Sequence, residues 1–231
     1  DIAHCAACTL FLKTERNTLS FAMRTSDDLL PPFEVPLYHP DTGEPMIGYV
    51  SSYVALKNEL IIIDDVYAET RFDLSGTKDF SDQTGFRTVS MLTVPLSPRS
   101  DEVIGVLQLM NALAPETGAV IPFPTELISY VEALAAQSAV ALENHNLLAA
   151  QKELMDSMIQ ILAGAIDAKS AYTGNHCKRV PELAAMLAKA AGEVTTGSLA
   201  DFSFKTDDEW REFRVGAWLH DCGKVTTPEY V

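Results

Sequence analysis

The sequence predicts an α+β domain with an antiparallel sheet and flanking helices, then a long connecting helix and an all-α C-terminal part. Three observations carry this prediction. Strand-like runs occur in pairs joined by short polar turns in the first half of the chain. From Thr125 the apolar residues change to a helical period without proline, and the last part of the chain keeps a helical pattern.

The first elements predicted are two strands joined in a hairpin. The runs CTLFL and NTLSFAM are strand-like, and the polar turn KTERN lies between them. The stretch 26–45 is rich in proline and has no helical period, which predicts a loop.

A helix, a strand and a second hairpin are expected next. Residues 46–58 carry apolar side chains at helical spacing, and ELIIIDDV at 59–66 is typical of a short buried strand. Residues 84–112 contain two strand-like runs across a turn that includes Pro98, which indicates the second hairpin. Paired strands with helices between them favour the antiparallel sheet.

A long helix is expected over residues 125–169, a stretch with no proline and one glycine. It would be ~65 Å long and could not bury its seam within one small domain, which predicts a parallel homodimer through it. The alternative is two helices broken near Asn144–Asn146. A walk of alternating four- and three-residue steps lands mostly on apolar residues: Leu127, Val131, Leu134, Ser138, Ala141, His145, Leu148, Lys152, Met155, Ile159, Leu162 and Ile166.

The last part of the chain carries three helix-start signals. Thr173 is a candidate cap for a helix that ends at Gly192, with a kink or a late start at Pro181. Thr206 with Glu209 forms a capping box before the next helix. A final threonine–proline pair starts a further helix as the sequence ends, which predicts that the chain is part of a longer protein.

Charge and composition limit the function classes. The net charge of −15 argues against binding a nucleic-acid polymer, which requires many cation–phosphate contacts. No apolar run has the length of a membrane span and no signal peptide is visible, so a cytoplasmic location is expected. Cys5 and Cys8 have CxxC spacing, but no second pair follows, which favours free thiols over a zinc site.

The stretches GYVSSYVALKNELIIIDDVYAETRF, TGFRTVSMLTVPL, VIGVLQLMNA and PFPTELISYVEALAAQSAVALEN resemble a GAF domain over residues 1–145. The resemblance implies a small-molecule sensor module, with a pocket beside the sheet and its first helix upstream of Asp1. Some GAF domains bind cyclic nucleotides through an Asn-Lys…Phe…Asp-Glu signature. Asn111 and Phe123 match it, whereas Ala112 replaces the lysine and only Glu126 remains of the acidic pair. The resemblance therefore does not predict a cyclic-nucleotide ligand, and the pocket residues stay unassigned.

The stretches AIDAKSAYTGNHCKRVPELAAMLA and WLHDCGKVTTPEYV resemble the first part of an HD-type metal-dependent phosphohydrolase of the HD-GYP group, over residues 170–231. The resemblance implies metal ligands at His176, His220 and Asp221, with Asp221 and Lys224 as catalytic residues. Members of this group hydrolyse cyclic di-GMP with two or three metals, commonly iron or manganese. Ser170 and Tyr172 differ from many relatives, and Tyr172 favours a two-metal site. The later ligands of the group would lie downstream of Val231.

The chemistry of these residues agrees with that implication. Imidazole and carboxylate are good ligands for iron, manganese or zinc, and a carboxylate such as Asp221 can bridge two ions. Bound metals activate water and neutralise phosphoryl charge, to which Lys224 adds a cation. Arg179 is expected to have a structural role. The remaining histidines have no partner at ligand spacing, and they are His4, His39 and His145.

Two functions remain open from the sequence. The first is a sensor that regulates an HD-type phosphodiesterase, with iron or manganese as cofactor and a cyclic dinucleotide as substrate. The alternative is a non-catalytic ligand-sensing and dimerisation module with a degenerate HD part. Three protein ligands leave each metal under-coordinated, so residues 1–231 alone are expected to have little or no hydrolase activity and to retain metal weakly.

Overall fold

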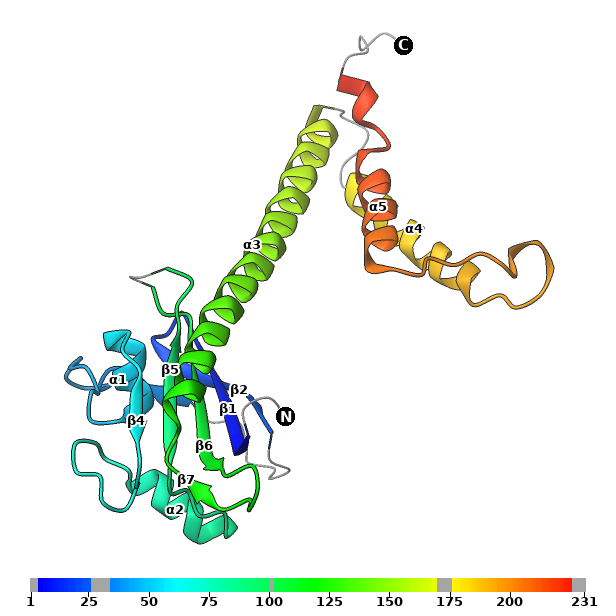
Figure 1. Cartoon of the computed structure of the whole chain (residues 1–231). Helices are drawn as coiled ribbons and strands as arrows, with labels where there is room; N and C mark the ends of the chain where they lie inside the picture. The colour runs from blue at the N-terminus through cyan, green and yellow to red at the C-terminus, as the bar shows by residue number, and fades with distance from the viewer. Residues whose placement is uncertain (1–3, 26–33, 100–101, 170–175, 226–231) are drawn as a thin grey trace. The chain divides into compact units, whose positions relative to one another are not determined.

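The computed structural model describes residues 4–25, 34–99, 102–169 and 176–225 of the chain (Figure 1). These residues form two compact units, Asp1–Asn146 and Leu147–Val231. The first unit contains the sheet and the second is helical.

The first unit is built on one antiparallel sheet of seven strands in the order β3-β2-β1-β6-β5-β4, with β7 paired to β6. Both predicted hairpins are confirmed, since β1 pairs with β2 and β5 pairs with β6. The strands are β1 (Cys5–Lys13), β2 (Thr18–Arg24), β3 (Glu34–Pro36), β4 (Ile61–Ile63), β5 (Met91–Leu96), β6 (Gly105–Leu113) and β7 (Val120–Ile121).

The sheet separates two hydrophobic clusters. One contains Val54 from helix α1 (Val50–Lys57) together with Phe11, Leu19 and Met91 from three strands. The other contains β5 and β6 residues and the first part of helix α3 (Thr125–Lys169). Strand β5 contributes to both clusters, which explains why its sequence MLTVPL is apolar almost without alternation.

The sequence prediction missed three elements of this unit. The short strand β3 lies in the predicted proline-rich loop and pairs with β2. Helix α2 (Ser75–Thr84) has a polar sequence, SGTKDFSDQT, with Phe80 as its one large apolar residue, and it buries only Ser81, so it offers few apolar residues to recognise. The two-residue strand β7 is too short to show an alternating pattern.

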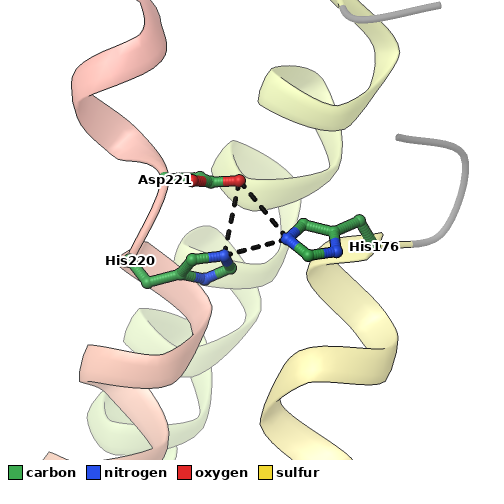
Figure 2. A group of neighbouring side chains, drawn as sticks. All are labelled: His176, His220 and Asp221. Carbon is green, nitrogen blue, oxygen red and sulfur yellow. Dashed lines mark hydrogen bonds and ion pairs between the residues drawn. The ribbon is translucent and has the colours of Figure 1, made fainter. Parts of the chain in front are cut away.

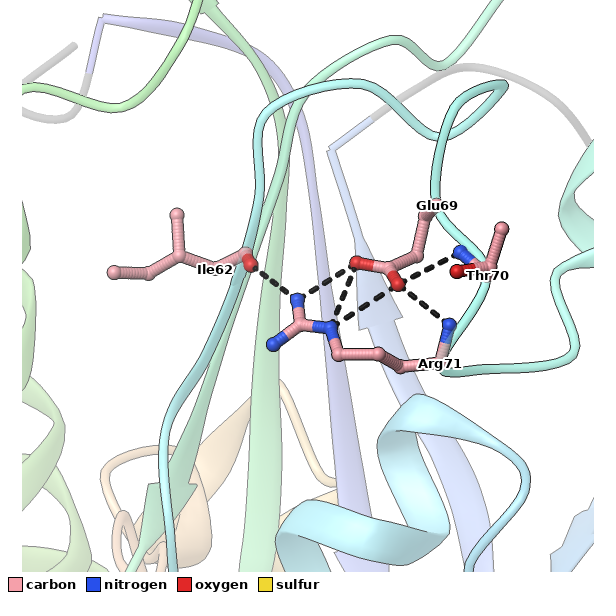
Figure 3. A network of polar contacts seen from close by, with 4 residues as sticks. All are labelled: Ile62, Glu69, Thr70 and Arg71. Carbon is pink, nitrogen blue, oxygen red and sulfur yellow. Dashed lines mark hydrogen bonds and ion pairs between the residues drawn. The ribbon is translucent and has the colours of Figure 1, made fainter.

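A polar network closes the exposed edge of β4, the last strand in the sheet order (Figure 3). The Arg71 guanidinium donates to both carboxylate oxygens of Glu69 and, over 3.3 Å, to the carbonyl oxygen of Ile62. The backbone N–H groups of Thr70 and Arg71 also donate to Glu69. These hydrogen bonds hold the pKa of Glu69 at about 2, with the Arg71 side chain as the main cause.

Helix α3 runs without a break through Asn144–Asn146, so the alternative of two separate helices is wrong. In the first unit it buries Val131, Ala135 and Ala139 against the sheet. This row follows four-residue steps and shares Val131 with the predicted dimer seam, whereas Leu134 of that seam is exposed in the single chain. Alanines on the buried row allow the helix to lie close to the sheet.

The second unit packs helices α4 (His176–Gly192) and α5 (Asp207–Leu219) together with the later part of α3. The predicted capping box is confirmed: the Thr206 hydroxyl accepts from the Glu209 N–H, and the Glu209 carboxylate accepts from the Thr206 N–H. Helix α4 begins at His176 and continues through Pro181, so the predicted late start is wrong.

One row of residues on the later part of α3 contacts α5, and it contains both polar and apolar side chains. Lys152 pairs with Asp208 at 3.0 Å, and Arg211 pairs with Asp156 at 2.8 Å. Ile159 lies on the same row and lines a small cavity with residues of α5. The predicted dimer seam included Lys152 and Ile159, and this part of it is wrong because α5 occupies that face.

Another row of the same helix is apolar and exposed. It consists of two sets of residues spaced seven apart, and we call it the α3 seam. Leu148, Met155 and Leu162 belonged to the predicted walk. The second set was not predicted and contains Leu147, Leu154 and Ile161. Among the described residues, no helix is long and apolar enough to cross a membrane.

Candidate metal centre

Three of the predicted ligands lie together in the second unit (Figure 2). His176 is the first residue of α4, and His220 and Asp221 directly follow the last residue of α5. Helices α4 and α5 contact each other, which brings the start of one beside the end of the other. Residues 44 positions apart in sequence therefore point their side chains toward a common centre.

The distances in this cluster fit a single metal ion. His176 Nε2 and His220 Nε2 lie 3.1 Å apart, and Asp221 Oδ2 lies 3.5 Å from the first and 3.3 Å from the second. A circle through the three atoms has a radius of about 1.9 Å, so an ion at ~2.0–2.2 Å from each would lie just outside their plane. Two imidazoles and one carboxylate are a donor set that suits iron(II) with further positions open.

The hydrogen bond behind His220 orients its ring for this purpose. Nδ1 of His220 lies 2.7 Å from the carbonyl oxygen of Ala217, so Nδ1 carries the proton and donates. In the neutral ring this leaves the lone pair on Nε2, which faces His176 and Asp221. Carbonyl partners of this kind fix the tautomer and orientation of metal-binding histidines.

Other residues named for the HD-type resemblance are not among those whose side chains the structure describes. Ser170 and Tyr172, like the predicted cap Thr173, lie outside the described residues, and so does the side chain of Lys224. Arg179 is exposed on α4, and none of the ion pairs between described residues includes it.

The remaining histidines are exposed, and none of them belongs to the group of possible metal ligands among the described residues. They are His4, His39 and His145. Cys5, Cys8 and Cys222 are free thiols. Burial raises the pKa of Cys8 to about 11, with the neighbouring Cys5 adding to the shift. The CxxC pair is therefore protonated and half-buried near neutral pH, which is unlike a reactive or metal-binding pair.

A cavity of about 300 Å³ lies in the first unit, on the face of the sheet covered by α1 and α2, and we call it the sheet cavity. None of the residues that line it was predicted from the sequence, because they come from separate strands and helices and form no local motif. Its apolar lining includes three phenylalanines and a methionine, and hydroxyl, amide and carboxylate side chains complete it. The lining includes Thr9, Asp73, Gly76, Thr88, Gln108 and Met110.

The two residues that match a cyclic-nucleotide signature do not line the sheet cavity. Asn111 has a φ of 56° and binds backbone groups: its Oδ1 accepts from the Val89 N–H and its Nδ2 donates to the Arg87 carbonyl. Phe123 is buried in the cluster under α3, on the other face of the sheet. Both residues have structural roles that explain their presence.

Comparison with known proteins identifies the first unit. A family model described as "GAF domain" matches residues 1–142. Solved GAF domains similar to the chain include one from an Acinetobacter phosphoenolpyruvate-protein phosphotransferase, at 17% identity over 64% of this chain and 75% of that one, with a TM-score of 0.44. Another comes from a Bacillus halodurans two-component sensor histidine kinase, at 15% identity, 63% and 86% coverage and a TM-score of 0.46. GAF domains bind small-molecule ligands and are typical of signalling sensors. The family match covers more than half of the chain, and the protein belongs to the GAF domain family.

Proposed function

We propose that this chain is the sensor and the first catalytic segment of an HD-type phosphohydrolase, with a cyclic dinucleotide, cyclic di-GMP, as substrate. The observation that supports it is the convergence of His176, His220 and Asp221 from the two segments that resemble the HD family. The geometry of these three side chains fits a metal ion without rearrangement. Iron or manganese is the metal that we propose for the centre.

The chain's own residues have distinct roles in this proposal. His176 and His220 would each supply one nitrogen, and Asp221 would supply an oxygen that lies near both rings. The carbonyl of Ala217 keeps the His220 lone pair directed at the centre. Bound metals supply Lewis-acid activation of water and charge neutralisation at phosphorus. Lys224 would add a cation for the phosphoryl oxygens.

We also propose that two copies pair in parallel through the α3 seam and that the GAF domain acts on the catalytic segment through this helix. Each set of the seam repeats every seven residues, which is the heptad period of a left-handed coiled coil. Its members are large, apolar and exposed. Regulation requires two states of the dimer that the GAF ligand binds with different affinity.

The alternative is a ligand-sensing and dimerisation module whose HD-type part has lost catalysis. It is equally consistent with a GAF domain followed by a long helix. The two functions differ in one property, which is turnover of a phosphodiester by the metal centre.

The deciding experiment uses the full-length protein, loaded anaerobically with iron or with manganese. Hydrolysis of cyclic di-GMP is measured beside a variant carrying His220→Ala and Asp221→Ala. We expect turnover that the double variant loses. A matched control replaces the exposed His145 with alanine and should keep full turnover. No turnover with either metal, on cyclic di-GMP or on a generic phosphodiester, would favour the non-catalytic alternative.

A further inference from the structure

The floor of the sheet cavity carries polar groups that the fold does not use fully. Thr9 on β1 and Gln108 on β6 are cross-strand partners. Thr9 is 4% exposed, and its hydroxyl forms no hydrogen bond with any side chain that the structure describes. The buried Thr88 hydroxyl donates to the sulfur of Met110, at 4.0 Å, and bonds to no oxygen or nitrogen of the described residues. Buried hydroxyls without an oxygen or nitrogen partner are unusual, and they are available to a ligand.

The side-chain amide of Gln108 supplies a hydrogen-bond acceptor, its oxygen, on the same floor of the cavity. Its Nε2 donates weakly to Thr93, at 3.4 Å, and lies 3.2 Å from the sulfur of Met91. These contacts engage the amide nitrogen and leave the amide oxygen for a ligand, since no side chain among the described residues donates to it. Thr9 and Gln108 therefore present a hydroxyl and an amide side by side at the base of a cavity whose lining includes three phenylalanines.

The rim of the cavity disfavours an anion. The Asp73 carboxylate lies there and accepts hydrogen bonds from the Ser75 hydroxyl and the Ser75 N–H, which lower its pKa. These bonds place a carboxylate at the start of α2, where the helix dipole would otherwise attract an anion. None of the described side chains that line the cavity is a lysine, an arginine or a histidine.

We propose that the sheet cavity binds a small, flat, uncharged or cationic aromatic molecule, held by Thr9 and Gln108 at one edge. The volume of about 300 Å³ lies at the lower end of the range for small-molecule pockets, which suits a small ligand. The aromatic walls contact its faces, and the amide and hydroxyl bind its polar edge. This inference rests on the sensing part of the proposed function and is independent of the metal centre.

Benzamide, benzamidine and benzoate test the charge preference, because they share one shape and differ in charge. Binding to the whole chain is measured by calorimetry and by ligand-detected NMR at millimolar concentrations. We expect saturable binding of benzamide and benzamidine and affinity for benzoate that is about tenfold lower or weaker, because burying an unpaired carboxylate is costly. Equal or tighter binding of benzoate or cyclic GMP, or no saturable binding of the other two, would overturn the proposal.

Two variants test the location. Thr9→Val removes one hydroxyl at nearly constant volume, and the affinity for benzamide should fall about threefold to tenfold, as expected for one hydrogen bond. Thr117→Val makes the same change in an exposed turn and should leave it unaltered. Gly76→Phe enters open space at the cavity wall and should abolish binding. Unchanged affinity in both cavity variants would refute the assignment.

The same titration in the His220→Ala and Asp221→Ala double variant separates this inference from the catalytic proposal. Benzamide should bind the double variant as it binds the unaltered chain. A protein that binds benzamide but never hydrolyses a phosphodiester would refute only the metal-dependent function. A protein with turnover but no cavity ligand would refute only the inference about the sheet cavity.

Discussion

The α3 seam predicts a specific loss of dimerisation when Leu154 and Ile161 are truncated. Leu154 and Ile161 are 62% and 71% exposed in the single chain. Fully burying such a side chain contributes about 1.5–3 kcal/mol, so burying the exposed part contributes about 1–2 kcal/mol. Leu154→Ala with Ile161→Ala changes four side chains in the dimer and should lower its dissociation free energy by up to about 4–8 kcal/mol. This corresponds to an increase in Kd of up to about three to six orders of magnitude.

Sedimentation velocity over a concentration series at micromolar protein measures this change. The matched control is Leu183→Ala with Leu187→Ala on α4, where the side chains are 57% and 71% exposed but lie outside the seam. The control should leave the dimer intact. An unaltered chain that is monomeric at micromolar concentration would contradict the reasoning. Equal loss of dimer in the two pairs of variants would also contradict it.

Three smaller predictions concern stability and reactivity. Glu69→Gln should lower the free energy of unfolding by about 1–2 kcal/mol, because it removes a charged acceptor. A lowered pKa stabilises the fold above the ordinary carboxyl pKa, so denaturant titrations should show this contribution at pH 7 and its loss as pH falls toward about 2. Thr206→Ala should cost about 1 kcal/mol, whereas Thr196→Ala, at a cap without a side-chain bond, should cost less. In alkylation at pH 8 the exposed Cys222 should react first and Cys8 slowly, and equal rates would refute the assigned burial.

The parts of the fold that the sequence could predict are long and rich in apolar residues. The two hairpins and the continuous helix α3 repeat apolar residues over enough positions to be recognised. Helix α2 and strand β3 do not, since one is polar and the other has three residues. Their positions depend on contacts with the sheet that are distant in sequence.

The metal centre and the sheet cavity also differ in how far the sequence could predict them. His220 and Asp221 are adjacent, and His176 lies in a segment with its own family resemblance, so local patterns were enough to select them. The sheet cavity joins single residues from several elements, and only the folded sheet places Thr9 beside Gln108. The predicted dimer seam included a row of α3 that contacts α5 instead, through the ion pairs of Lys152 with Asp208 and of Asp156 with Arg211.

Manganese binding to residues 1–231 tests the central claim most directly. Electron paramagnetic resonance of a Mn²⁺ titration reports free and bound ion in the unaltered chain and in His176→Ala, Asp221→Ala and His145→Ala variants. We predict one weak site per chain that the first two variants lose and that His145→Ala retains, because only the first two remove ligands of the cluster. Binding that survives both ligand variants, or tightly held stoichiometric metal in the purified chain, would contradict the account.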